Sequence, residues 1–220
     1  MHINYDKLTS KHNPDRRLDL TYVIDVSASM TDTIESIRKH LNKSLKQQRK
    51  AQFGMAVKTY VTVLSFSEGV NVLRLNQPLD TLPPLKRKEL EPESYTALYD
   101  ATKLALEWAE DRSGGLVKAG SGMVNVSIFT DGQENASETT KDQMMAKVNK
   151  LKKRNGWVID LWASDEVVIK DFEDIGFESD QLNHVEVGEE KMAIQGMDAR
   201  ISECVKRIED LKGFDADFES

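Results

Sequence analysis

The chain has 220 residues, of which 39% are hydrophobic and 30% are charged, and its formal net charge is −7 at pH 7. The length fits one folded α/β domain, and the negative charge disfavours nucleic acid or an anionic membrane as the main partner. The N-terminal residues are polar, no stretch approaches the roughly 18 apolar residues that a spanning helix needs, and the single cysteine, Cys204, excludes an intrachain disulfide. These features predict a cytoplasmic protein that is neither secreted nor membrane-spanning.

The first half of the chain alternates between strand-like and helix-like segments. Residues 18–26 are apolar and β-branched, which predicts a buried strand. Residues 32–52 carry apolar side chains at helical spacing and predict a helix. Residues 55–66 alternate between apolar and polar, so we expect a second strand there. Residues 71–76 then form a short partner strand that closes a hairpin.

The second half continues the alternation of helices and strands. Helices are predicted over residues 96–111, 140–154, 165–175 and 190–212. Strands are predicted over residues 123–130, 157–163 and 183–187, and residues 114–122 read as a flexible loop. This order predicts an α/β fold with a doubly wound, mostly parallel central sheet, one antiparallel edge strand and helices on both faces, as in Rossmann-like domains.

Three short segments place oxygen-bearing side chains at predicted strand ends or helix starts. Asp25-Val26-Ser27-Ala28-Ser29 ends the first strand, Thr96 opens a helix, and Thr130-Asp131-Gly132 ends a central strand. Functional groups of such folds gather at the carboxyl ends of the strands, so we expect these segments to converge. Hydroxyls and carboxylates are hard donors, which suit Mg²⁺, Mn²⁺ or Ca²⁺ rather than Zn²⁺.

With these segments the sequence resembles the von Willebrand factor A (VWA) domain family. The metal ion-dependent adhesion site (MIDAS) of that family combines Asp-x-Ser-x-Ser with a distant threonine and a distant aspartate. The matching positions are Asp25, Ser27, Ser29, Thr96 and Asp131. The similarity covers residues 18 to about 211, and the segments TALYDA, FTDGQENAS and NGW are similar to those of stand-alone bacterial and bacteriophage members. Many relatives carry glycines before the threonine, whereas this chain has Ser94-Tyr95, which makes the loop bulkier.

The resemblance implies a function without catalytic residues. Ser27, Ser29 and Thr96 would bind the ion directly, and Asp25 and Asp131 would bind it through water. An open coordination position would then accept an Asp or Glu carboxylate of a partner protein, with loops near Tyr95, Gln133 and Glu134 setting specificity. Bacterial relatives often work beside AAA+ ATPases of the MoxR or chelatase type, or in stress-related and phage-related systems, so the resemblance makes such a partner the expected one.

Plainer interpretations exist for each segment. Asp131-Gly132 is an ordinary turn signal, and Thr96 can be the N-cap of its own helix. The hydroxyls and acids that follow the first strand can cap the next helix, with a capping box between Asp32 and Glu35. The residues that this reading assigns to capping are Ser29, Thr31 and Asp32.

Two other functions compete with metal-dependent binding. An aspartate after the first strand, here Asp25, can be the nucleophile of a small Mg²⁺-dependent phosphohydrolase. Such folds usually place a second acid two residues later, where this chain has Ser27. The third function is a structural component of an assembly whose metal site is vestigial.

The predicted domain covers residues 18–212. Residues 1–17 read as a polar N-terminal leader, and residues 213–220 as an acidic and aromatic C-terminal tail. The tail is interpreted as a frayed terminus. A sharper hypothesis is that one of its acids reaches the metal of a neighbouring molecule; these acids are Asp215, Asp217 and Glu219.

Overall fold

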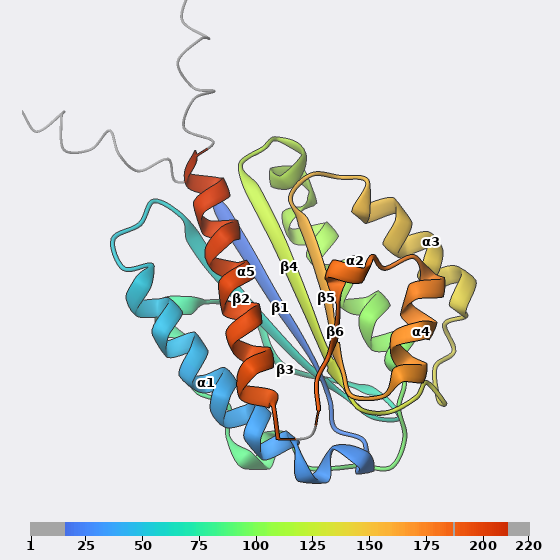
Figure 1. Cartoon of the computed structure of the whole chain (residues 1–220). Helices are drawn as coiled ribbons and strands as arrows, with labels where there is room; N and C mark the ends of the chain where they lie inside the picture. Colours follow the sequence, from blue (N-terminus) through green and yellow to red (C-terminus); the bar gives the residue numbers. More distant parts are fainter. Residues whose placement is uncertain (1–15, 187, 211–220) are drawn as a thin grey trace, which may run out of the picture.

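The computed structural model describes residues 16–186 and 188–210, in which strands and helices alternate (Figure 1). The strands are β1 (Arg17–Asp25), β2 (Lys58–Phe66), β3 (Val70–Pro78), β4 (Gly122–Thr130), β5 (Trp157–Ala163) and β6 (Leu182–His184). The α-helices are α1 (Ile34–Ala51), α2 (Leu98–Lys118), α3 (Lys141–Lys152), α4 (Glu166–Ile175) and α5 (Glu190–Asp210). The predicted leader and tail fall almost entirely outside the described residues, although Arg17 already belongs to β1.

The strands form one sheet with the order β3-β2-β1-β4-β5-β6. Every neighbouring pair is parallel except β2 and β3, which are antiparallel. The turn between β2 and β3 is tight, with Ser67 N donating to Gly69 O at 3.0 Å, and only antiparallel strands accept so short a connection. The prediction of a mostly parallel sheet with one antiparallel edge strand is therefore confirmed.

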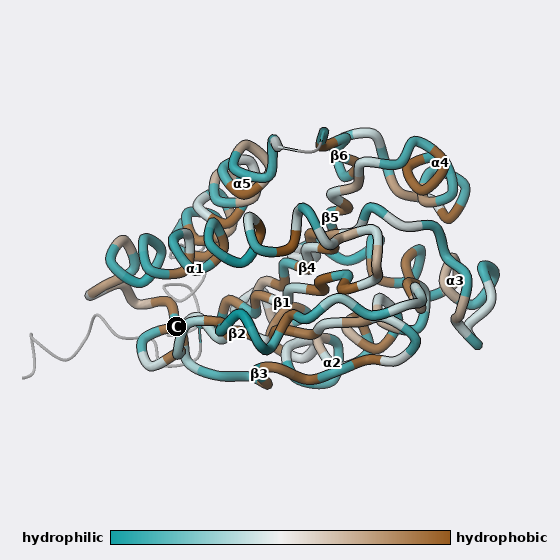
Figure 2. Tube along the Cα trace, turned by 90° about the horizontal axis from the view of Figure 1, so that it is seen from below, coloured by the Kyte–Doolittle hydropathy of each residue, from teal (hydrophilic) through white to brown (hydrophobic). Residues whose placement is uncertain are grey.

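Two hydrophobic cores lie on opposite faces of the sheet. Side chains of α1 and α5 pack with Leu20, Tyr22 and Ile24 of β1 on one face. Side chains of α2, α3 and α4 pack with the intervening Val23 and with β4 on the other. Figure 2, which looks along the strands, shows them as a diagonal row from β6 at the top to β3 at the bottom, with α1 and α5 on the left of this row and α2 and α3 on its right. Because successive side chains of a strand point to opposite faces, the central strands are buried on both sides.

Helix α2 is longer than predicted. A helix over residues 96–111 and a flexible loop over 114–122 were expected, but α2 continues through two glycines to Lys118. Ser113 and Val117 are both buried, and the Ser113 hydroxyl donates to Asp19 Oδ2 of β1 at 2.9 Å. Packing of this last part of the helix against the sheet outweighs the low helix propensity of glycine.

The start of α1 and the strand β6 also differ from the prediction. A short 3₁₀ helix over Ala28–Asp32 precedes α1, and Glu35 binds the Arg38 guanidinium at 2.7 Å rather than forming a capping box with Asp32. Strand β6 is three residues long instead of the five predicted over 183–187. Within the described part of the chain, none of the helices combines the length and apolar character needed to cross a membrane.

Candidate metal site

Asp25 is the last residue of β1. The carboxyl ends of the parallel strands meet at one edge of the sheet, at the bottom of Figure 1. The carboxylate is fully buried at the end of β1, next to the end of β4. Its Oδ1 accepts from Ser27 N at 2.7 Å, and its Oδ2 accepts from the Thr130 hydroxyl at 2.5 Å. Burial raises the pKa of Asp25 to about 6, and the hydrogen bonds from Thr130 and Ser27 act in the opposite direction. Asp25 thereby ties the turn after β1 to β4.

The two serines after β1 contact the aspartate after β4. Ser27 Oγ and Ser29 Oγ are 3.0 Å apart, and the Ser29 hydroxyl donates to Asp131 Oδ1 at 2.5 Å. Asp131 is partly buried, which raises the pKa of its carboxyl, while the bond from Ser29 lowers it. Residues 102 positions apart are thus in direct contact.

Thr96 completes a cluster of three hydroxyl oxygens around Gly132. A Cβ placed on this glycine would lie 3.1 Å from Thr96 Oγ1, 3.3 Å from Ser29 Oγ and 3.4 Å from Ser27 Oγ. The backbone of Gly132 is not in the left-handed conformation, so a glycine is not needed here for its backbone freedom. Its lack of a side chain leaves open the space that a methyl group would fill. We call the space bounded by Ser27, Ser29, Thr96 and Gly132 the hydroxyl cradle.

The donors of the cradle fit a hard divalent cation. Three neutral hydroxyls lie within 3.1 to 3.4 Å of one point. Asp25 accepts from Ser27 N, and Asp131 accepts from the Ser29 hydroxyl. Oxygen donors of this kind suit Mg²⁺, Mn²⁺ and Ca²⁺. In residues 16–186 and 188–210 no group of three or more His, Cys, Asp or Glu side chains is placed to hold a metal, so an ion at this place would depend mainly on the hydroxyl oxygens.

Helix capping does not account for these hydroxyls. The N-cap residue of α2 is Ala97, and the Thr96 hydroxyl faces the cradle instead. The N-cap residue of α1 is Thr33, whose hydroxyl donates to Met30 O at 3.2 Å, whereas Ser29 binds Asp131. The capping interpretation of Thr96 and Ser29 is therefore wrong.

Sequence reasoning missed several residues that build the site. Thr130 and Gly132 belong to the segment Thr130-Asp131-Gly132, but its pattern does not predict the hydrogen bond from the Thr130 hydroxyl to Asp25 or the space beside Gly132. The loop near Glu134 is expected to contribute to partner specificity, but a cap was not predicted there. The half-buried Glu134 carboxylate accepts from Tyr99 N at 2.9 Å, which caps α2, and from Ser137 N at 2.7 Å in its own loop.

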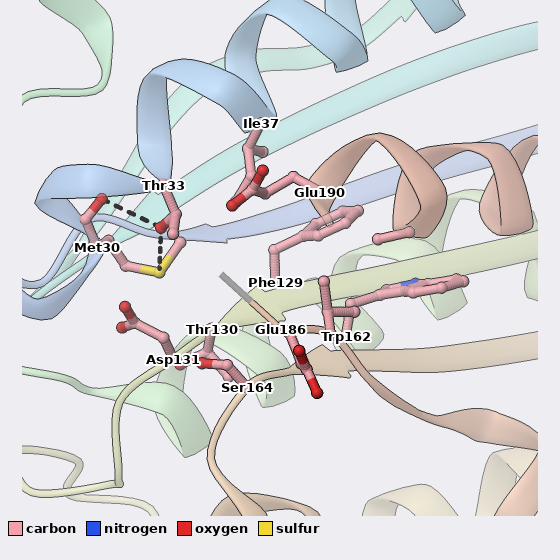
Figure 3. A pocket seen from close by; sticks show the side chains of 12 residues that line it. Met30, Thr33, Ile37, Phe129, Thr130, Asp131, Trp162, Ser164, Glu186 and Glu190 are labelled. Carbon is pink, nitrogen blue, oxygen red and sulfur yellow. Dashed lines mark hydrogen bonds between the residues drawn. The ribbon is translucent and has the colours of Figure 1, made fainter. Parts of the chain in front are cut away.

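A separate apolar pocket borders the site on the side of α1 and α5 (Figure 3). Its volume is about 30 Å³, and the rings of Phe129 and Trp162, whose centroids are 6.3 Å apart, stack in its lining. Asp131 belongs to its lining, but the residues of the hydroxyl cradle do not. The pocket thus borders the candidate metal site and shares Asp131 with it.

Comparison with known proteins places the fold. No protein-family model and no curated protein matches the sequence. The von Willebrand factor domain of the type V pili tip protein Mfa5 from Porphyromonas gingivalis has a similar structure, with a TM-score of 0.62 and 10% identity over 87% of this chain and 97% of that chain. The ArnB paralog VWA2 from Sulfolobus acidocaldarius is also similar, with a TM-score of 0.52 and 15% identity over 81% of this chain and 43% of that chain.

A third similar structure is that of a protein with a metal in its MIDAS. It is the proximal thread matrix protein 1 of the mussel byssus with a zinc-occupied MIDAS motif, with a TM-score of 0.51 and 16% identity over 82% of this chain and 47% of that chain. This chain spans less than half of several such proteins, including 30% of the pilus adhesin SpaC from Lactobacillus rhamnosus GG. The described part of this chain has the von Willebrand factor A fold.

Proposed function

We propose that this protein is a metal-dependent protein-interaction module that binds an Asp or Glu carboxylate of its partner. The observation that carries the proposal is the convergence of three hydroxyl oxygens on the space beside Gly132. Asp25 accepts from the backbone of Ser27, and Asp131 accepts from the Ser29 hydroxyl. Mg²⁺ is the proposed ion, with Mn²⁺ or Ca²⁺ as substitutes, and when bound it supplies a coordination position for an anionic oxygen. The zinc-occupied MIDAS motif of the mussel matrix protein supports a divalent cation at this place in the fold.

The residues of this chain suit the binding of an external anion. Ser27, Ser29 and Thr96 carry no charge, so among the five polar groups only the two aspartates can balance the charge of a cation. Two exposed apolar side chains lie on neighbouring segments. Tyr95, next to Thr96 in the chain, is 52% exposed, and Val167 at the start of α4, which lines a groove with Gln133 and Glu134, is 57% exposed. We call Tyr95 and Val167 the rim. We propose that a partner places its carboxylate at the ion and an apolar side chain against this rim.

A phosphohydrolase is less well supported than a binding module. Both carboxylate oxygens of Asp25 are engaged, one by Ser27 N and the other by the Thr130 hydroxyl, which restrains this side chain from attacking a phosphorus atom. The position of the second acid of such enzymes is Ser27. We therefore propose that the protein is not an enzyme. The single cysteine and the resemblance of the motifs are the grounds for proposing that it acts in the cytoplasm of a bacterium or in a phage-related system. By the resemblance of its motifs, the partner to test first is an AAA+ ATPase.

Capture of partners with and without metal tests this function. The tagged protein is incubated with a bacterial lysate in Mg²⁺ or in EDTA, and captured proteins are identified by mass spectrometry. We expect a partner that is captured in Mg²⁺, lost in EDTA, and lost with Asp25→Ala or Thr96→Ala. Thr31→Ala is the matched control, because the Thr31 hydroxyl is exposed and binds the carbonyl of Ala28 at 2.6 Å.

Two outcomes would contradict the proposal. Capture that is equal in EDTA and Mg²⁺ would mean that the interaction does not use the metal. Mg²⁺-dependent hydrolysis of p-nitrophenyl phosphate that disappears with Asp25→Ala would favour the phosphohydrolase instead.

A further inference from the structure

Helix α2, which follows Thr96, takes its N-terminal caps from a distant segment. Its N-cap residue, Ala97, has no side-chain acceptor, although the first N–H groups of any helix lack partners within the helix. Tyr99 N donates to Glu134 Oε2 at 2.9 Å, and Asp100 N donates to Ser137 Oγ at 3.0 Å. The caps therefore come from the loop that follows Asp131 and Gly132.

The connection also runs in the opposite direction. The carboxylate of Asp100 accepts from Glu138 N and from Thr139 N, both at 2.9 Å. Within the same loop, Glu134 Oε1 accepts from Ala136 N at 2.8 Å, which stabilises the turn of the loop. Residues 134–139, which we call the strap, are thus bound to the first turn of α2 by backbone and side-chain hydrogen bonds.

Asn135 connects the strap to Thr96 itself. Thr96 N donates to Asn135 Oδ1 at 2.9 Å, and Asn135 N donates to Thr96 O at 3.1 Å. On the far side, Ala97 N donates to Ser67 O at the end of β2 at 2.6 Å. The peptide groups on either side of the Thr96 side chain are therefore fixed, and one of the fixing residues lies only three positions after Gly132.

We propose that Asn135 is a positioning residue of the metal site, and that its side-chain amide holds the Thr96 hydroxyl in register with Ser27, Ser29 and Gly132. The inference rests on the proposed metal site. The ligands approach the cradle from segments far apart in the chain, and Asn135 is the residue of the strap that contacts a ligand directly. Groups that orient metal ligands typically account for about 10-fold to 100-fold in metal affinity.

Mn²⁺ affinity separates this positioning role from a general contribution to folding. The dissociation constant of Mn²⁺ is measured by electron paramagnetic resonance, well below the unfolding transition, for the unaltered protein, Asn135→Ala and Asn135→Asp. We expect Asn135→Ala to weaken Mn²⁺ binding about tenfold or more. Asn135→Asp keeps the acceptor for Thr96 N, so it should bind at least as tightly as the unaltered protein.

Asn149→Ala is the matched control. Asn149 is an exposed asparagine on α3, outside the strap and the cradle, so the Mn²⁺ affinity of this variant should stay within twofold of the unaltered protein. Urea unfolding in EDTA is recorded in parallel, to show that each variant is folded under the binding conditions. If Asn135→Ala does not fold, Asn135→Ser replaces it with the same expectation, since the shorter side chain does not reach Thr96 N.

The outcomes distinguish this inference from the proposed function. Equal Mn²⁺ affinities of the unaltered protein and Asn135→Ala would overturn the positioning role and leave the metal site intact. The same follows if Asn135→Asp binds as weakly as Asn135→Ala, because the acceptor would then not matter. If the unaltered protein binds no Mn²⁺, the proposed function fails, and the positioning role fails with it.

Discussion

Gly132→Ala should abolish or strongly weaken metal binding while leaving the fold almost unchanged. The added methyl would lie 3.1 to 3.4 Å from the hydroxyl oxygens of Thr96, Ser29 and Ser27. An ion that is bound about 2.1 Å from the same oxygens needs this space for itself or for its water. We expect the dissociation constant of Mn²⁺ to rise at least tenfold, which corresponds to about 1.4 kcal/mol of binding free energy.

The effect on folding is expected to be smaller. Contacts of 3.1 to 3.4 Å require the neighbouring hydroxyls to move by only a few tenths of an ångström, and glycine has no left-handed conformation to preserve here. The free energy of unfolding in EDTA should therefore fall by no more than about 1 kcal/mol, the lower end of the cost of adding a methylene to a packed site.

Isothermal titration with Mn²⁺ and urea unfolding in EDTA measure the two effects separately. Gly69→Ala is the control, because a Cβ on Gly69 meets no atom within 4 Å. If Gly132→Ala bound Mn²⁺ with unchanged affinity, the ion would not occupy the space beside Gly132, and the proposed location of the metal site would be wrong.

Three further predictions concern the polar groups around and beyond the site. Thr130→Val removes a donor to the buried Asp25 carboxylate, so we expect urea titration to show a loss of about 1–3 kcal/mol in unfolding free energy, largely restored in Thr130→Ser. Arg200→Met deprives the buried Asp160 of its cation and should cost about 3 kcal/mol; adding Asp160→Asn should recover most of this loss, and an undiminished loss would show that Arg200 acts by packing. Three basic side chains lower the pKa of Glu110 from 4.5 to about 2, so its ion pairs stabilise the fold above pH 4.5 and this contribution disappears as the pH falls through 2. Glu110→Gln should therefore lower the unfolding free energy at pH 7 by about 1 kcal/mol or less and not at pH 2, and an equal loss at both pH values would contradict this.

The sheet and most helices could be predicted because their patterns are local. Residues 18–26 are continuously apolar and β-branched, as central parallel strands are. The end of α2 could not be predicted, since Gly114 and Gly115 lower helix propensity and only burial of Ser113 and Val117 against the sheet outweighs it.

That the segments after β1 and β4 meet could be predicted, because parallel strands bring their carboxyl ends to one edge. Thr96, and the choice of the five candidate ligands, came from the resemblance to the VWA motif. The structure brings the hydroxyls of Ser27, Ser29 and Thr96 together, with Asp131 bonded to Ser29 and Asp25 bonded to the turn. The hydrogen bonds that hold the loops together could not be predicted from the sequence. Asn135 and Thr96 are 39 residues apart, and no spacing rule connects a side-chain amide to a backbone N–H at that separation.

Whether a divalent ion occupies the hydroxyl cradle can be seen in an anomalous difference map from crystals grown with MnCl₂. We expect a manganese peak about 2.1 Å from the hydroxyl oxygens of Ser27, Ser29 and Thr96, as hard-ion coordination requires. Absence of a peak at the hydroxyl cradle, or a peak held by other side chains, would contradict the proposed metal site.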